Sequence, residues 1–406
     1  MRILIVTHYF PPEVGAPQAR LSELARAWAA AGDDVTVLTG MPNHPTGVIP
    51  PAYRRAVRRR ERVDGYRVVR TWLYATPNEK VLRRTLGHLS FMVSAALLGG
   101  RVAGPADIVV VSSPTFFSIG AAWVLARCKR ARLVVEVRDL WPAVFRDLGV
   151  VTNRVALAVL ERLELAAYRA ATAVVVVTEG FRANLIDRGI PPAKVHTIRN
   201  GADLQLFTGD TPSNIALRTR LGAGRHESLV LYAGAHGISH ALPVVADAAQ
   251  LLRDSAIRFA FVGDGAEKER LRRRLVALRL SNVVLQPSVM RVRMPALLAS
   301  ADICLVSLRD ITIFDSFVPS KIFELLAAGR PVIGAVAGEA ADILSAAGAV
   351  VVPPEDPGAL ARAIRELAGD PHRQRVMSAA ARAYAQVHCD RAVLAATYRD
   401  LLAGLP

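Results

Sequence analysis

Two charged residues in the stretch VPSKIFELLAAGRPVI, residues 318–333, have the types and spacing to bind an anionic ligand. Ser320 and Gly329 are typical start and stop signals of a short helix, which places Lys321 in its first turn and Glu324 one turn later. A cation in the first turn opposes the helix dipole, so stability alone does not select Lys321. A phosphate at the helix N-terminus reverses this argument, because Lys321 and the free N–H groups then converge on it. We therefore consider an anion site, in which Glu324 accepts hydrogen bonds from a sugar diol, and a solvated surface pair as the alternative.

The elements that must position this helix alternate between strands and helices. Short apolar runs such as ILIVT and DIVVVSS in the first half, and LVLYAG and PVIGAV in the second, are separated by helical patterns. Near-continuous apolar strands of this kind predict parallel sheets that are covered on both faces. The pattern breaks at RNGADLQLFTGDTPSN, residues 199–214. We therefore expect two doubly wound α/β domains.

The loops that follow the strands are where such folds bind ligands. The first expected strand is followed by THYFPPEVGAPQAR, which contains Gly15 but no G-x-G-x-x-G fingerprint. No acidic residue takes the ribose role either, which disfavours an NAD-dependent dehydrogenase. Residues 262–271, VGDGAEKERL, place Gly263 and Gly265 at a strand-to-helix turn where a backbone can approach a ligand closely. Turns of this kind also serve ordinary packing.

Composition limits the class of protein. The 406 residues suggest two domains, and a hydrophobic content of 52% excludes a disordered chain. The three cysteines, Cys128, Cys304 and Cys389, lack the spacing of a metal site or a disulfide framework. A reducing compartment fits them best. The opening MRILIV is too short for a signal peptide, so we expect it to form the first strand.

Positive charge is concentrated in the first half of the chain. Residues 1–200 contain 28 Lys and Arg against 15 Asp and Glu, and residues 54–84 contain 11 basic against 3 acidic residues. Nucleic acid, an anionic membrane surface and a diphosphate-bearing substrate are all candidate partners. The sequence contains no helix-turn-helix signature, zinc spacing or aromatic RNA-binding motif, so we predict no nucleic-acid partner.

An uncharged segment, TLGHLSFMVSAALLGG at residues 85–100, follows the basic block. It is shorter than the ~20 residues that a membrane-spanning helix usually needs, which disfavours a transmembrane segment. Arg83, Arg84 and Arg101 flank it, as in helices that lie in a membrane interface. A core helix of the first domain is the other interpretation.

Read together, these motifs resemble the retaining glycosyltransferases of family four over almost the whole chain. The similarity points to the subgroup of bacterial O-antigen and capsule enzymes that includes the fucosamine transferase and the colanic-acid glycosyltransferases. The motifs that carry it are YFPPEVGAPQAR, GMPNHPTG, VRDLWP at 137–142, IRNGADLQLF at 198–207, YAGAHG at 232–237, FVGDG at 261–265 and VPSKIFELLAAGRPVI.

The resemblance implies the GT-B architecture, an α/β fold of two facing Rossmann-like domains with parallel sheets and an interdomain cleft. It implies an acceptor-binding domain at 1–200, a transition at 201–227, a donor-binding domain at 228–385, and a C-terminal helix at 386–406 that can pack back on the first domain. The donor is a nucleotide sugar, with a UDP-sugar expected, and no cofactor is needed.

The resemblance also assigns residues to roles. Lys321 would meet the diphosphate, Glu324 the ribose hydroxyls, and Pro287, Ser288 and Val289 the base. The remaining donor-binding positions are Gly15, Gly234, His236, Gly237, Gly263, Gly265 and Ser320. For the acceptor, the matching positions are Asn43, His44, Arg138 and Asp139.

The sequence departs from the family at several positions. The usual pair of glutamates separated by seven residues is incomplete, because Ser316 stands where Glu324 would have its partner, with Asp315 as a substitute. The Arg and Lys that are common after the first donor-domain strand are replaced by Ala235 and His240. Neutralisation of the phosphates would then depend on Lys321, the helix N-terminus and His236. In the first domain, Arg138-Asp139 replaces a His-Asp or His-Glu pair.

Glycosyl transfer requires stabilisation of the departing nucleotide diphosphate, for which Lys321 is the natural catalytic group. Asp139 follows the strand LVVEVR and is the first candidate for activating the acceptor, either as a base or by positioning it; a turn cap is the alternative role. No convincing Asp-x-Asp motif occurs, so we predict no catalytic metal.

The sequence thus predicts a hexosyltransferase-type enzyme of cell-surface polysaccharide synthesis. It would move an N-acetylated hexose or deoxyhexose to a lipid-diphosphate-linked saccharide, while bound peripherally to the cytoplasmic face of the membrane. Two alternatives remain open at this stage: a nucleotide-sugar 2-epimerase or hydrolase of the same architecture, and a noncatalytic anion-binding module.

Overall fold

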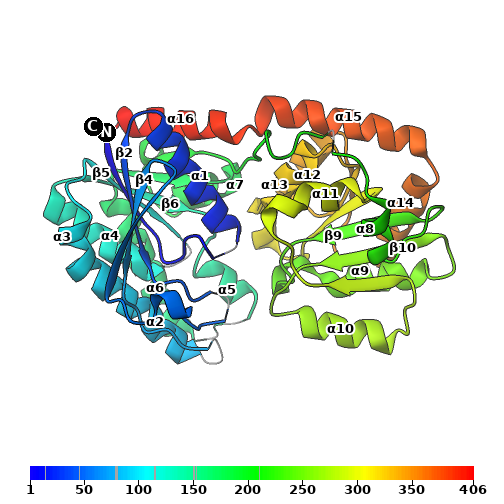
Figure 1. Cartoon of the computed structure of the whole chain (residues 1–406), viewed down its shortest axis with the longest axis horizontal. Helices are drawn as coiled ribbons and strands as arrows, with labels where there is room; N and C mark the ends of the chain where they lie inside the picture. The colour runs from blue at the N-terminus through cyan, green and yellow to red at the C-terminus, as the bar shows by residue number, and fades with distance from the viewer. Residues whose placement is uncertain are drawn as a thin grey trace. The chain divides into compact units, whose positions relative to one another are not determined.

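Two units of α/β structure make up the chain (Figure 1). The first contains Met1–Arg199 and Ala392–Pro406, and the second contains Asn200–Arg391. The structure, a computed structural model, describes residues 1–13, 15–44, 46–77, 81–113, 116–149, 151, 153–209 and 211–406. The expectation of two doubly wound α/β domains is confirmed, since each unit has its own sheet with helices packed on it.

The first unit is built on an eight-stranded sheet in the order β3-β4-β2-β1-β5-β6-β7-β8. All neighbours are parallel except β3, which runs antiparallel to β4 at one edge. The central strand β5 reads IVVVS and is buried at every residue, as expected for a strand covered on both faces. The strands are β1 (Arg2–Val6), β2 (Asp34–Gly40), β3 (Arg58–Val63), β4 (Tyr66–Thr71), β5 (Ile108–Ser112), β6 (Arg132–Val137), β7 (Ala173–Val176) and β8 (Val195–Thr197).

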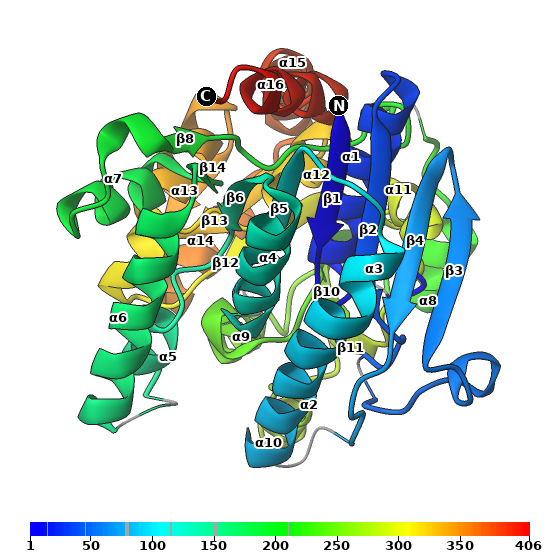
Figure 2. The same cartoon turned by 90° about the vertical axis from the view of Figure 1, so that its left-hand side faces the viewer.

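Helices cover both faces of this sheet. On one face, α1 and the C-terminal helix α16 pack over Ile3, Ile5 and the inward residues of neighbouring strands. The Trp28 indole N–H donates to the Ala395 carbonyl at 2.9 Å, which ties α1 to α16. On the other face, α2, α4 and α6 lie side by side (Figure 2). The helices are α1 (Ala16–Ala30), α2 (Val81–Ser94) with its π-helical continuation η2 (Ala95–Gly99), α3 (Gly100–Val102), α4 (Phe116–Lys129), α5 (Ala143–Asp147), α6 (Arg154–Ala170), α7 (Glu179–Asp187) and α16 (Arg391–Ala403), with short 3-10 turns η1 (Pro51–Tyr53) and η3 (Pro192–Lys194).

The second unit is built on a six-stranded parallel sheet in the order β11-β10-β9-β12-β13-β14. Its core gathers Tyr232, Phe259, Phe261 and the aliphatic residues of α9 and α14. Strands are β9 (Ser228–Ala233), β10 (Ile257–Val262), β11 (Val283–Gln286), β12 (Ile303–Ser307), β13 (Val332–Ala335) and β14 (Val350–Val352). Helices are α8 (Ile215–Arg220), η4 (Ile238–His240), α9 (Leu242–Leu251), α10 (Lys268–Ala277), η5 (Arg291–Arg293), α11 (Met294–Ala299), η6 (Thr312–Ser316), α12 (Lys321–Ala327), α13 (Gly338–Ala346), α14 (Pro357–Ala368) and α15 (Pro371–His388).

Two expected boundaries need correction. Residues 201–227 are not a separate transition but part of the second unit, because Arg218 of α8 forms a 2.9 Å ion pair with Asp302 and Leu221 is buried. The chain returns to the first unit after Arg391, not after residue 385, since α15 packs on α12 within the second unit. Within the described ranges, no helix combines the length and apolarity of a membrane span.

Candidate functional site

The helix that carries Lys321 and Glu324 is anchored by its apolar side. Ile322, Leu325 and Leu326 of α12 are buried, which leaves Lys321 and Glu324 on the remaining, partly exposed side. The predicted cap is wrong in one respect. Ser320 adopts helical backbone angles, and its side chain makes no capping hydrogen bond. The Ile322 N–H instead donates to the Pro319 carbonyl at 3.0 Å. The start of α12 is therefore set by backbone, not by the serine hydroxyl.

The Lys321 ammonium is buried at the start of α12. Its Nζ lies 3.7 Å from the centre of the Tyr232 ring, a cation–π contact, and has no hydrogen-bond partner among the residues that the structure describes. Burial lowers the pKa of Lys321 to about 7, although the nearby Glu324 carboxylate acts in the opposite direction. A buried cation with unsatisfied donors is costly, so Lys321 is a strong candidate to receive an anionic ligand.

Three glycines let backbone segments approach one another beside Lys321. A Cβ at Gly234 would lie 2.8 Å from Lys321 Nζ, and one at Gly263 would lie 1.8 Å from the Gly234 carbonyl oxygen. A Cβ at Gly265 would lie 2.4 Å from the His236 carbonyl oxygen. The turns after β9 and β10 are also joined, since the His236 N–H donates to the Asp264 carbonyl at 2.9 Å. Gly237 differs, because a Cβ there would meet nothing closer than 3.6 Å.

Two histidines beside Lys321 are uncharged at neutral pH. Burial and nearby cations, Lys268 and Lys321 for His236 and Lys321 for His240, lower the pKa of His236 to about 4 and that of His240 to about 3. Both ring nitrogens of His236 are buried and lack hydrogen-bond partners in the described part of the chain. The predicted part of His236 in neutralising phosphates stays a prediction, because a bound phosphate would raise the pKa of this imidazole. A neutral imidazole can donate one hydrogen bond, but it adds no positive charge.

Glu324 faces two guanidinium groups that sequence reasoning missed. Its Oε1 lies 3.9 Å from a terminal nitrogen of Arg291 and 3.9 Å from one of Arg391. The Nε of Arg391 also donates to the Gly201 carbonyl at 3.1 Å, which holds the end of the second unit to its beginning. Arg291 is close in sequence to the predicted base-binding loop, but nothing in the sequence pointed to Arg391.

The predicted base-binding loop is attached to the turn after β10. The Ser288 N–H donates to Asp264 Oδ2 at 2.8 Å, and Lys268 Nζ lies 2.5 Å from Asp264 Oδ1. Burial opposes ionisation, but these hydrogen bonds lower the pKa of Asp264 to about 2. Pro287 and Ser288 are exposed and Val289 is half-buried. The structure thus brings the predicted donor-site residues of the second unit to the carboxyl ends of β9–β11 and the start of α12: Gly234, His236, Gly237, Gly263, Gly265, Pro287, Ser288, Val289, Ser320, Lys321 and Glu324.

Ser316 and Asp315, the residues near the position of the family's second glutamate, do not form a carboxylate pair with Glu324 in the contacts of the described residues. The Ser316 hydroxyl donates to the Ile313 carbonyl at 2.8 Å within η6, so it is already engaged. Asp315 is exposed. Its backbone leaves no room for a side chain at Gly338, where a Cβ would lie 2.1 Å from the Asp315 carbonyl oxygen.

In the first unit, Asp139 lies just beyond the carboxyl end of β6. Burial raises its pKa to about 6, while the charge of Arg138 acts in the opposite direction. Burial also lowers the pKa of the Arg138 guanidinium. Behind this pair, Glu136 is fully buried and accepts from Arg20 Nε at 3.0 Å. A carboxyl group with a pKa near 6 is suited to accept a proton near neutral pH.

Asn43 and His44 are held in place by Glu13, which the sequence interpretation did not single out. The backbone N–H groups of Asn43 and His44 both donate to Glu13 Oε1 at 2.8 Å. Burial raises the pKa of Glu13, against the effect of these hydrogen bonds. Gly15 precedes α1 in extended backbone, φ 169°, a conformation open to any residue.

Aromatic and imidazole rings gather next to this loop. His8 and Tyr9, which follow β1, lie 4.3 Å apart between ring centres, and His88 of α2 lies 4.4 Å from His8. His44 completes the group, 5.1 Å from Tyr9. Burial lowers the pKa values of His8 and His44, and the neighbouring imidazoles lower that of His8 further. Of these rings, His44 is exposed and Tyr9 and His88 are half-buried, whereas His8 is buried. Tyr9, His44 and His88 are therefore the rings of this group that can stack on a sugar.

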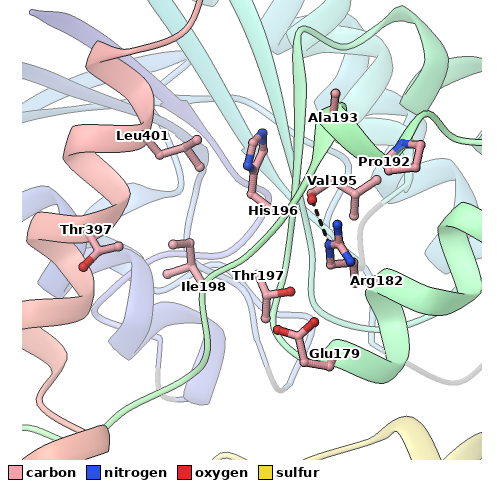
Figure 3. Close-up of a pocket in the computed structure, with 10 residues that line it drawn as sticks. All are labelled: Glu179, Arg182, Pro192, Ala193, Val195, His196, Thr197, Ile198, Thr397 and Leu401. Carbon is pink, nitrogen blue, oxygen red and sulfur yellow. Dashed lines mark hydrogen bonds between the residues drawn. The ribbon is translucent and has the colours of Figure 1, made fainter.

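A cavity of about 520 Å³ opens elsewhere in the first unit, between α7, β8 and α16 (Figure 3). Arg182 lines it and donates through Nε to the Val195 carbonyl at 3.2 Å. None of the predicted donor, acceptor or catalytic residues lines this cavity. Among the described residues there is also no group of three or more His, Cys, Asp or Glu side chains arranged to hold a metal ion.

Comparisons with known proteins show that both halves of the chain match glycosyltransferase families. The "Glycosyl transferase 4-like domain" family matches residues 15–201, and the "Glycosyl transferases group 1" family matches residues 227–370. The colanic acid biosynthesis glycosyl transferase WcaI of Escherichia coli is 28% identical over 403 residues, 96% of this chain and 97% of WcaI.

Solved structures with the same fold include sucrose-phosphate synthase from Thermosynechococcus elongatus, with a TM-score of 0.76, 21% identity and 99% of both chains covered. HepE of Anabaena in complex with UDP-glucose has a TM-score of 0.74 and 17% identity, with 100% of both chains covered. At these identities the two structures bear on the fold alone.

Proposed function

Since this chain belongs to the glycosyltransferases with the GT-B fold, we propose that it transfers a sugar from a nucleotide-sugar donor to a lipid-linked saccharide with retention of configuration. The proposed product belongs to cell-surface polysaccharide synthesis, as the name of WcaI suggests for that relative. The proposed donor is a UDP-sugar, supported by the UDP-glucose complex of HepE. The transferred sugar is an N-acetylated hexose or a deoxyhexose.

One observation carries this proposal: the buried Lys321 ammonium, which lacks a hydrogen-bond partner among the described residues. A bound diphosphate would supply acceptors for it, together with the N–H groups at the start of α12. As the glycosidic bond breaks, negative charge grows on the diphosphate, and a fixed cation stabilises that charge. We assign Lys321 this role and Glu324 the ribose hydroxyls.

The glycines and histidines around Lys321 complete the proposed donor site. Gly234, Gly263 and Gly265 let the turns after β9 and β10 pack closely beside Lys321, because a Cβ at any of them would meet neighbouring backbone or the Lys321 ammonium. Neutral His236 can donate one hydrogen bond to a phosphate or a sugar hydroxyl. The exposed loop Pro287–Val289 is the proposed contact for the base.

In the first unit we assign the acceptor to Asp139, Arg138, Asn43 and His44. Asp139 accepts the proton of the attacking hydroxyl or orients that hydroxyl toward the leaving phosphate. The rings of Tyr9 and His44 offer a stacking surface for the acceptor saccharide. No catalytic metal is part of the proposal.

A two-step experiment tests the proposed function. Activated sugars are first screened for thermal stabilisation of the protein, and the stabilising donor is then offered with a lipid-diphosphate saccharide. Donor-specific stabilisation followed by transfer supports the proposal. Release of free, epimerised sugar without transfer supports a 2-epimerase, and stabilisation by polyanions in general supports a noncatalytic anion-binding module.

We also propose that the enzyme works at the cytoplasmic face of the membrane, bound to anionic lipid. The support is the excess of 11 basic over 3 acidic residues in segment 54–84, beside the uncharged segment 85–100. Each basic residue near an anionic bilayer contributes about 1 kcal/mol. Binding to anionic vesicles should weaken with salt, and weaken again when the exposed Arg58, Arg59 and Arg60 of β3 become serine.

A further inference from the structure

The helix layer α2–α4–α6 of the first unit leaves large apolar side chains exposed. On α2 and its continuation these are Leu86, Val93, Leu97 and Leu98, of which Leu97 is 70% exposed. The inward side of the same helix is packed, since Phe91, Ser94 and Ala95 are buried. The core-helix interpretation of segment 85–100 therefore holds for one side of the helix, while the exposed apolar side leaves the interfacial interpretation as a prediction.

The apolar surface continues across the neighbouring helices. On α4, Trp123 is 42% exposed beside Val124. On α6, Val155, Val159 and Leu163 are exposed at four-residue spacing, which places them on one side of the helix. The three helices lie side by side on one face of the sheet (Figure 2), and α4 packs against both α2 and α6. We call this surface the α2–α4–α6 face.

The helices of this apolar surface carry exposed basic side chains, and their few acidic side chains form ion pairs. The sequences of α2, η2, α3 and α4 contain no Asp or Glu, and α6 contains only Glu161 and Glu164. Glu164 is buried and pairs with Arg188 at 2.5 Å, and Glu161 pairs with Arg146 at 3.1 Å. Among the described side chains, the exposed charges on these helices are therefore basic: Arg83, Arg101, Arg127, Arg154, Arg162 and Arg169.

Trp123 and Arg127 illustrate how the two kinds of surface are combined. The Arg127 guanidinium lies 5.3 Å from the centre of the Trp123 ring. Tryptophan and arginine together favour the boundary between acyl chains and headgroups, where the ring is in the apolar layer and the cation meets lipid phosphate. Helices that lie in a membrane interface likewise combine exposed apolar residues with basic neighbours.

We propose that the α2–α4–α6 face is the surface by which this protein lies on an anionic bilayer. The proposal deepens the membrane association in the proposed function by naming the surface that contacts the lipid. The β3 arginines lie outside this surface and contribute electrostatic attraction to the anionic bilayer. It also connects the membrane to the acceptor residues, because α2 carries His88, next to His8 and Tyr9, on the helix whose other side is exposed. A lipid-linked acceptor would then be presented along the helix that borders the candidate acceptor site.

Vesicle binding tests this face with a matched control. The double variant Leu97→Glu with Val155→Glu changes two of the most exposed apolar residues of the face, where folding should tolerate the change. The control is Val276→Glu on α10 of the second unit, where the valine is 72% exposed. Co-sedimentation is measured with vesicles of phosphatidylglycerol and phosphatidylethanolamine and with vesicles of phosphatidylcholine alone.

The parent protein should bind the anionic vesicles and only weakly the phosphatidylcholine vesicles. The double variant should lower the partition coefficient by about tenfold or more, because a side chain of this size is lost from the apolar layer at each site. Replacing Arg154 and Arg162 by serine should lower it about fivefold for each arginine, and Val276→Glu should leave it unchanged. Trp123 emission should shift to shorter wavelength on binding, with the shift lost in Trp123→Phe.

Three outcomes would overturn the proposal: no binding of the parent to anionic vesicles at low salt, full binding of the double variant, or equal loss in the Val276→Glu control. If the parent does not bind anionic vesicles and a protein partner is instead captured specifically on this face, the surface belongs to that partner. Thermal stabilisation by UDP is measured in parallel on the same variants. Its absence in the parent would count against the proposed donor site and leave the membrane result standing.

Discussion

The depressed pKa of Lys321 makes nucleotide affinity depend on pH in a defined way. In the free protein this pKa is about 7, so the side chain is half charged at neutral pH. A bound diphosphate favours the charged form and raises the pKa, so binding above neutral pH must take up a proton. The terminal phosphate of UDP is itself protonated below about pH 6, so the dependence is read above about pH 7. There the affinity for UDP should fall by up to roughly tenfold per pH unit, or roughly fiftyfold between about pH 7 and pH 9.

Isothermal titration with UDP measures this dependence directly. Repeating the titration near pH 8 in buffers with different ionisation enthalpies counts the proton taken up. The control is Lys321→Arg, whose guanidinium stays charged over the whole range, so its affinity should change little. His236 and His240 titrate at about 4 and about 3, outside this window. Tight UDP binding by the parent protein that is independent of pH, with no proton uptake, would refute the assignment of Lys321 to the diphosphate.

Four further results are expected. Lys321→Ala should weaken nucleotide-sugar turnover and Glu324→Gln nucleoside recognition, by ~1.5–3 kcal/mol each for a lost charge-assisted contact, and kinetics within about twofold of the parent would contradict both roles. Gly263→Ala should lose UDP binding and lower the free energy of unfolding, measured by denaturant titration, by ~1–3 kcal/mol, because its Cβ would lie 1.8 Å from a carbonyl oxygen. The control Gly237→Ala, whose Cβ would have 3.6 Å of clearance, should behave like the parent. Asp139→Asn should lower the transfer rate with UDP affinity unchanged; in the parent, the rate should rise as the pH passes about 6, where Asp139 loses its proton, and a parent rate independent of pH there would argue against a base. EDTA should leave activity intact, and a loss that magnesium or manganese restores would reveal a metal site.

The architecture and the centre of the donor site could be predicted because they depend on local signals. Near-continuous apolar strands between helices indicated two parallel sheets, and both are present. Lys321 stood out because a lysine in the first turn of a helix is unfavourable without an anion. In the structure the ammonium is also buried, and a buried cation needs an anionic partner more than an exposed one does.

What escaped prediction depends on long-range packing. The neutral state of His236 and His240 follows from burial under segments that no local pattern identifies. Arg391 approaches Glu324 only because the end of the second unit returns to its beginning. Ser320 looked like a cap because of its type, but its backbone angles are already helical, which leaves its hydroxyl out of the capping position. The linker was misplaced since composition alone does not show that Arg218 pairs with Asp302.

The central claim is that this chain transfers a sugar from a nucleotide donor with retention of configuration. The most direct measurement incubates the protein with a panel of UDP-linked N-acetylhexosamines and deoxyhexoses and a prenyl-diphosphate-linked saccharide, then analyses the lipid product by mass spectrometry and NMR. We predict a gain of one sugar residue whose anomeric configuration equals that of the donor, and no gain with Lys321→Ala. A product of inverted configuration, or release of free sugar with no gain on the lipid, would contradict the claim.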